Sequence, residues 1–156
     1  MRNFFNKKAV MPLLTEAEQK FNEWGVKYKR KSDGTLVVRE LDISSKKLTR
    51  LPDLSNVVVR GDFICQNNLL TSLVGSPKSV GRGFYCDANR LTSLVGAPQT
   101  VAGYVSCRSN PLKSLAGAPR KFARLSSNLG DFYSRDAIPA ALLVELPSNT
   151  PKPPQP

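Results

Sequence analysis

Three cysteines, Cys65, Cys86 and Cys107, stand 21 residues apart and are the side chains whose type and spacing most directly suggest chemistry. Three thiolates on adjacent strands can hold a soft metal ion, but zinc sites pair ligands two to four residues apart and take a fourth ligand. The chain has no His to supply one. A Cys without a His also lacks the base that activates a catalytic thiolate. We therefore interpret the thiols as small core residues and predict no catalytic, cofactor-binding or metal-binding residue.

The absence of His excludes more than a metal site. Ser-His pairs, Cys-His pairs and His general bases are all ruled out, so the sequence favours a protein that is not an enzyme. The 156 residues include 23 Lys and Arg against 12 Asp and Glu, a net charge of +11, which attracts acidic partners. No apolar run reaches the ~20 residues that span a bilayer, and the odd cysteine count suits a reducing compartment. We expect a soluble cytoplasmic protein without a membrane partner.

The cysteines belong to a repeat that organises most of the chain. Residues 63–73 recur at 84–94 and again at 105–115, each time 21 residues further on. A degenerate copy starts 22 residues earlier, at Leu41. Each full copy continues through a Gly, a Pro and an apolar residue: Gly75, Gly96 and Gly117; Pro77, Pro98 and Pro119; Val80, Val101 and Phe122. A period of this length predicts a solenoid in which each unit covers the apolar face of the next.

Each unit opens with an alternating pattern and then turns. In Phe84-Tyr85-Cys86, residues two apart share a face, which predicts a short strand with Phe84 and Cys86 pointing inward. Asn89 follows at a turn, where its amide can satisfy backbone groups. The later Gly-x-Pro segment disfavours a regular helix or strand on the return leg. We therefore expect one parallel sheet and a buried row formed by Asn68, Asn89 and Asn110.

The residues of this repeat resemble a known family. Phe84-x-Cys86-x-x-Asn89-x-Leu91-x-x-Leu94 is similar to the leucine-rich repeat consensus, with Cys86 in the second Leu place. More narrowly, the chain resembles short bacterial and bacteriophage repeats that read G-D-F-x-C-x-x-N-x-L-T-S-L-x-G-x-P, over about residues 41–122. The resemblance implies an α/β leucine-rich repeat solenoid with short parallel β-strands on a concave face. It also implies a binding scaffold, located in the host bacterial cytoplasm if the protein is of phage origin.

The flanking segments predict caps at both ends of the stack. Residues 1–40 form an N-terminal arm, a helix and a hairpin: the helix starts at the Thr15-Glu16-Ala17-Glu18 capping box and the hairpin turns at Asp33-Gly34. The repeats occupy residues 41–125. A C-terminal cap at 126–146 contains a short helix over 139–146, and 147–156 is a Pro-rich tail.

Strand alternation also assigns side chains to the exposed, concave face of the sheet. Tyr and Arg on such a face are the residue types that most often anchor protein interfaces. We predict a protein partner on this face, which the phage resemblance implies is a host or virion protein. The predicted contact residues are Asp62, Ile64, Tyr85, Asp87, Tyr104 and Arg108.

The basic hairpin is a second candidate surface. Lys27, Lys29, Arg30 and Lys31 follow one another along its first strand and can contact phosphates, while Tyr28 can stack on a base. A row of lysines also serves simply to keep an edge strand from pairing with other chains. The alternatives to a protein-binding module are therefore a basic nucleic-acid-binding accessory protein and a structural component of the virion.

Overall fold

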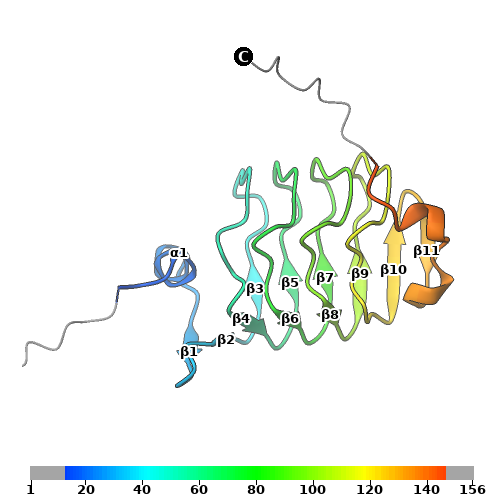
Figure 1. Cartoon of the computed structure of the whole chain (residues 1–156). Helices are drawn as coiled ribbons and strands as arrows, with labels where there is room; N and C mark the ends of the chain where they lie inside the picture. The colour runs from blue at the N-terminus through cyan, green and yellow to red at the C-terminus, as the bar shows by residue number, and fades with distance from the viewer. Residues whose placement is uncertain (1–12, 147–156) are drawn as a thin grey trace, which may run out of the picture.

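Each repeat folds into one coil of a β-solenoid that carries two short strands, and successive coils stand side by side in a row (Figure 1). The structure is a computed structural model that describes residues 13–146. A bend of two or three residues separates the two strands of a coil, as between β4 (Val57–Val59) and β5 (Phe63–Ile64). Two sheets therefore run along the solenoid and meet at the row of bends.

The predicted repeat strands form the larger, six-stranded sheet. Its strands follow the order β11-β10-β9-β7-β5-β3, and all neighbours are parallel except the terminal pair β10 and β11. Phe63 pairs in register with Phe84, and their rings stack with centroids 5.3 Å apart. The strands not yet bounded are β3 (Leu41–Asp42), β7 (Phe84–Tyr85), β9 (Tyr104–Ser106), β10 (Arg124–Ser127) and β11 (Gly130–Phe132).

The return leg of each coil is not irregular, as the Gly-x-Pro segment had suggested, but contains a strand of a second sheet. Pro77 and Pro98 each lie two residues before a strand, so their missing N–H groups fall outside the ladder. Val59, Val80 and Val101 then pair in register and point inward, where branched side chains favour extended backbone. The five-stranded sheet has the order β1-β2-β4-β6-β8, with β1 (Tyr28–Arg30), β2 (Leu36–Val38), β6 (Ser79–Val80) and β8 (Thr100–Val101).

A row of asparagines connects the coils, as predicted, and each asparagine comes four residues after a strand of the six-stranded sheet. Asn68, Asn89 and Asn110 are buried, and each donates from its side-chain amide to carbonyl oxygens of its own coil and of the preceding coil. Each side-chain oxygen accepts from a backbone nitrogen of the preceding coil. The prediction of inward Phe and Cys side chains is also confirmed, because Phe63, Phe84 and all three cysteines are fully buried.

The helix and hairpin before the repeats form where the sequence predicts them. Helix α1 (Glu16–Trp24) begins at a complete capping box and ends at Gly25, whose φ of 69° suits glycine. Its Phe21 is fully buried and belongs to the same apolar core as the repeat strands. Strands β1 and β2 then pair antiparallel around the Asp33-Gly34 turn. Of residues 13–146, only this segment forms an α-helix, and it is too short to cross a membrane.

The C-terminal segment differs from the predicted short helix over residues 139–146. It contains two 3-10 turns, Arg135–Ala137 and Ala140–Leu142. Leu142 and Leu143 donate backbone hydrogen bonds only three residues back, since so short an apolar stretch cannot offset the cost of nucleating an α-helix. Leu115 donates to the carbonyl of Leu142 and so ties the turn to the last repeat. The predicted tail at 147–156 and the first 12 residues of the arm lie outside the described residues.

Candidate functional site

Two tyrosines lie together on the outer side of the six-stranded sheet. The ring of Tyr85 crosses Gly83, where a Cβ atom would come within 2.5 Å of the phenol. The ring of Tyr104 meets Tyr85 edge-on, with centroids 6.0 Å apart and planes at 63°. The two residues are diagonal neighbours, because Tyr85 pairs in register with Ser106 on β9. The aromatic pair can therefore form because position 83 has no side chain to occupy the space of the Tyr85 ring.

The aromatic row continues through residues that the sequence did not indicate. The guanidinium carbon of Arg124 on β10 lies 5.8 Å from the ring centroid of Tyr104 and 5.5 Å from that of Tyr133. Arg124 also donates to Asp131 at 2.7 Å, which lowers the pKa of Asp131 below its ordinary value. We call Tyr85, Tyr104, Arg124 and Tyr133 the tyrosine face. Tyr133 is its most open member, with 68 % of the residue exposed.

The predicted carboxylates beside the tyrosines are engaged in holding coils together. Oδ1 of Asp62 accepts a hydrogen bond from the backbone nitrogen of Gly83 in the next coil, at 2.7 Å. Oδ1 of Asp87 accepts from Oγ of Ser106 at 2.5 Å and from the backbone nitrogen of Arg108 at 3.0 Å. These carboxylates therefore connect successive coils as well as bordering the tyrosine face.

The structure brings three of the six predicted contact residues into one hollow. Asp62, Tyr85 and Tyr104 line a shallow pocket of about 380 Å³ together with Arg82. Burial raises the pKa of Tyr85, and the negative charge of Asp62 raises it further, so the phenol is a hydrogen-bond donor at neutral pH. The other three lie outside the pocket: Ile64 in register with Tyr85, Asp87, and the exposed Arg108, whose Nη2 is 3.6 Å from Asp131.

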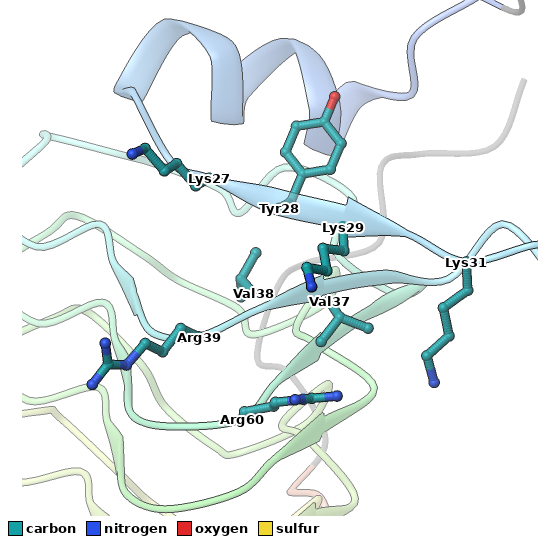
Figure 2. Close-up of a pocket in the computed structure, with 8 residues that line it drawn as sticks. All are labelled: Lys27, Tyr28, Lys29, Lys31, Val37, Val38, Arg39 and Arg60. Atoms are coloured by element: carbon teal, nitrogen blue, oxygen red, sulfur yellow. The ribbon is translucent and has the colours of Figure 1, made fainter.

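The basic hairpin carries a groove on the outer side of the five-stranded sheet, with a volume of about 580 Å³ (Figure 2). Lys29 and Lys31 lie on one side of β1 and Tyr28 on the other, directed toward α1 (Figure 2). Arg30 is not with the lysines, because strand alternation turns it toward α1, where it pairs with Glu18. We call the groove the basic groove; its lining residues are Lys27, Tyr28, Lys29, Lys31, Val37, Val38, Arg39 and Arg60.

Tyr28 is also unavailable for the stacking role suggested by its neighbours in sequence. Its ring packs against Phe21 of α1 with centroids 5.7 Å apart, and the residue is half-buried. Arg39 and Arg60 line the groove together with the three lysines, whereas Arg30 does not. Sequence reasoning missed both arginines because they lie 21 residues apart and meet only when coils stack, with Arg60 donating its backbone N–H to the carbonyl of Val38 at 3.0 Å.

The cysteine row lies in the interior, away from both surfaces. Burial raises the pKa of all three thiols, that of Cys107 to about 12, and the charge of Asp87 acts in the same direction. The thiols are therefore protonated at neutral pH and are poor nucleophiles. Within residues 13–146, no three Cys, Asp or Glu side chains form a group that could hold a metal ion.

No family model, curated protein or solved structure matches the chain. The resemblance to leucine-rich repeats therefore depends on the repeat residues themselves, and function has to be argued from the tyrosine face and the basic groove.

Proposed function

We propose that this protein is a non-enzymatic binding module that captures another protein on its tyrosine face. The observation that carries the proposal is the unbroken row of Tyr85, Tyr104, Arg124 and Tyr133 across the end of the six-stranded sheet. Tyr and Arg are the side chains that most often dominate the binding energy of protein interfaces, since they combine a large apolar area with a polar end.

The tyrosine face is also held in place before any partner arrives. Gly83 supports the ring of Tyr85, while Asp131 anchors the guanidinium that lies between Tyr104 and Tyr133. A partner that binds an ordered surface loses less side-chain entropy on association. Asp62 and Arg108 at the border add charged groups that can select among partners.

A binding role agrees with the state of the acidic side chains on this surface. Asp62 and Asp87, the carboxylates nearest to the tyrosines, each accept a backbone hydrogen bond from the following coil. A general acid or base has to exchange its proton with a substrate, and a carboxylate held in this way by its own scaffold is poorly suited to that task. This supports the proposal that the protein is not an enzyme.

The repeat residues support a more specific version of the proposal. The protein would be a short leucine-rich repeat protein of the bacterial and bacteriophage type, acting in the host cytoplasm on a host or virion protein. In this arrangement α1 and the β1–β2 hairpin cap the first coil, and β11 with the two 3-10 turns caps the last. Buried Phe21 at one end and buried Ile138 at the other, both in the apolar core, support those capping roles.

Site-specific photo-crosslinking tests the binding surface directly. A photoreactive phenylalanine analogue replaces Tyr104 in one variant and the exposed Thr100, on the outer side of the five-stranded sheet, in a matched control. In a nuclease-treated lysate of the producing cells, the Tyr104 probe is expected to form a discrete protein adduct that the Thr100 probe does not form. Identical adducts from both positions, or none from Tyr104, would contradict a partner on the tyrosine face.

A further inference from the structure

The basic groove holds a concentration of positive charge for which the fold provides little compensation. Five of its eight lining residues are cations and none is a carboxylate. The five ion pairs within residues 13–146 all use other cations: Lys20, Arg30, Arg50, Arg108 and Arg124. A nearby acid is Asp33 at the hairpin turn, whose pKa is lowered chiefly by hydrogen bonds from Thr35, with smaller effects of the charges of Lys31 and Lys78.

The backbone arranges these cations in rows. Three lysines stand two residues apart, Lys29 within β1 and Lys27 and Lys31 next to its two ends, so in extended backbone successive charged stems start about 7 Å apart. The last printed pair of the hairpin is Tyr28 with Val38, so continuing that register by one residue brings Lys27 level with Arg39. Like charges opposite one another destabilise a sheet. Lysines beside the edge strand β1 can keep that edge from pairing with other chains, but edge protection does not account for Arg39 and Arg60, which follow β2 and β4. Such an arrangement is explained by a ligand whose negative charges follow the same line.

We infer that the basic groove binds the sugar–phosphate backbone of nucleic acid without reading its sequence. A linear set of Lys and Arg side chains matches a regular polyanion, and Arg can bind a phosphate through two parallel hydrogen bonds. The protein's net charge of +11 adds a long-range attraction for the same ligand. Because Tyr28 packs on Phe21, the groove has no free aromatic ring for base stacking, which is why no sequence or base preference is expected.

The other polyanions fit the groove less well. A lipid surface would favour exposed apolar side chains beside the cations, but the large exposed ones of residues 13–146 all lie elsewhere: Leu13, Leu14, Val74, Tyr133, Val144 and Leu146. An acidic protein would favour an open Tyr or Trp anchor, and the only aromatic residue lining the groove is the half-buried Tyr28. The groove shares no lining residue with the pocket beside Tyr85, so this site is independent of the proposed protein-binding function.

Fluorescence anisotropy with a labelled oligothymidine of about 16 nucleotides tests the inference. The groove variant is Lys29→Gln/Arg60→Gln. Its control, Lys113→Gln/Arg120→Gln, removes the same charge from two exposed return-leg positions outside the groove. Between roughly 50 and 200 mM salt, the wild-type association constant should fall steeply, and the groove variant should lose about 1.4 from the slope of log K against log salt. The control should keep the wild-type slope.

Stability and competition measurements complete the test. Because repulsion is removed, the groove variant should melt no lower than the wild type, and Lys27→Gln/Lys31→Gln provides a second pair that should show the same loss of slope. An oligoadenosine and an oligothymidine of equal length should bind alike. Equal loss in the groove and control variants, absence of oligonucleotide binding by the wild type, or tighter binding of an oligoglutamate or an anionic vesicle than of the oligonucleotide would each overturn the inference.

Discussion

The side-chain oxygen of Asn89 accepts a hydrogen bond at 3.0 Å from the backbone nitrogen of Leu70, nineteen residues earlier in the chain. The amide of the same side chain donates to the carbonyls of Cys86 at 3.1 Å and Cys65 at 3.0 Å. One buried side chain thus satisfies backbone groups in two coils. The asparagine row therefore helps to hold successive coils in register.

Replacing Asn89 with Ala should therefore destabilise the protein. Backbone groups that are buried and lose their partners cost about 1 to 3 kcal/mol of unfolding free energy, which chemical denaturation measures. The exposed neighbour Arg90 provides the control, since Arg90→Ala removes a solvated side chain and should change the midpoint little. Equal midpoints for the two variants would show that the turn is not held by the asparagine side chain.

The residue before this asparagine carries backbone strain that glycine should relieve. Ala88 has φ of 51°, in the left-handed region, and the equivalent Asn67 and Ser109 have φ of 55°. Ala88→Gly should raise the free energy of unfolding by roughly 0.5 to 1 kcal/mol, because glycine adopts this conformation without a steric penalty. Ala102→Gly, at an exposed position with ordinary φ, should instead lower it. A change of the same sign in both variants would contradict the assignment.

The three thiols should resist alkylation until the protein unfolds. Cys65, Cys86 and Cys107 are fully buried, and burial raises their pKa values so that little thiolate is present at neutral pH. Mass spectrometry after iodoacetamide treatment should find no label on the native protein and three labels in denaturant. An Arg90→Cys variant reports on accessible thiols and should gain one label at once. Rapid labelling of the native row would mean that the coils are open.

The free energy of unfolding should fall in acid, partly because Glu18 becomes protonated. Arg30 donates to its carboxylate and lowers its pKa below the ordinary value of 4.5, with Thr15 acting in the same direction. The unfolded state then binds more protons than the folded state, so the stabilisation is complete above about pH 4.5 and disappears as pH falls through the folded pKa. Glu16 and Asp53 act with the same sign.

Denaturation midpoints measured across this pH range should separate the contribution of Glu18 from the rest. Glu18→Gln should be less stable than the wild type at neutral pH and should show a shallower loss of stability in acid. Arg30→Gln removes the cation of the same pair and should flatten the acid limb in a similar way, so combining the two changes should add little. A Glu18→Gln protein with the wild-type acid limb would show that the pair does not couple to folding.

The repeat strands, the asparagine row and the capping box could be predicted because each depends on residue types at short spacing. The second sheet could not be predicted, because Pro77 and Pro98 suggested an irregular return leg. In the structure each of these prolines lies two residues before a strand. The last coil departs from the 21-residue period, because Val105 pairs with Leu125, a step of twenty residues. The position of Arg124 opposite Tyr104 therefore could not be read from the period alone.

The tyrosine face and the basic groove differ in how many of their residues could be predicted from the sequence. Tyr85 and Tyr104 follow from strand alternation, but Tyr133 joins them only through the β10–β11 hairpin, which lies beyond the repeats. For the basic groove, alternation alone separates Lys29 and Lys31 from Arg30, so this signal was present in the sequence. Arg60 reaches the basic groove only because its coil stacks on the preceding one, and this neighbour could be identified only from the structure.

The most direct test of the account is capture of a protein partner by immobilised wild type and by the Tyr85→Ala/Tyr104→Ala variant, in nuclease-treated lysate of the producing cells. The basic-groove variant Lys29→Gln/Arg60→Gln serves as the matched control, since its changes lie outside the tyrosine face. We predict one protein that the wild type and the groove variant retain in equal amounts and that the tyrosine variant, still folded by its melting curve, does not retain. Equal retention of that protein by the folded tyrosine variant would contradict a binding site on this face.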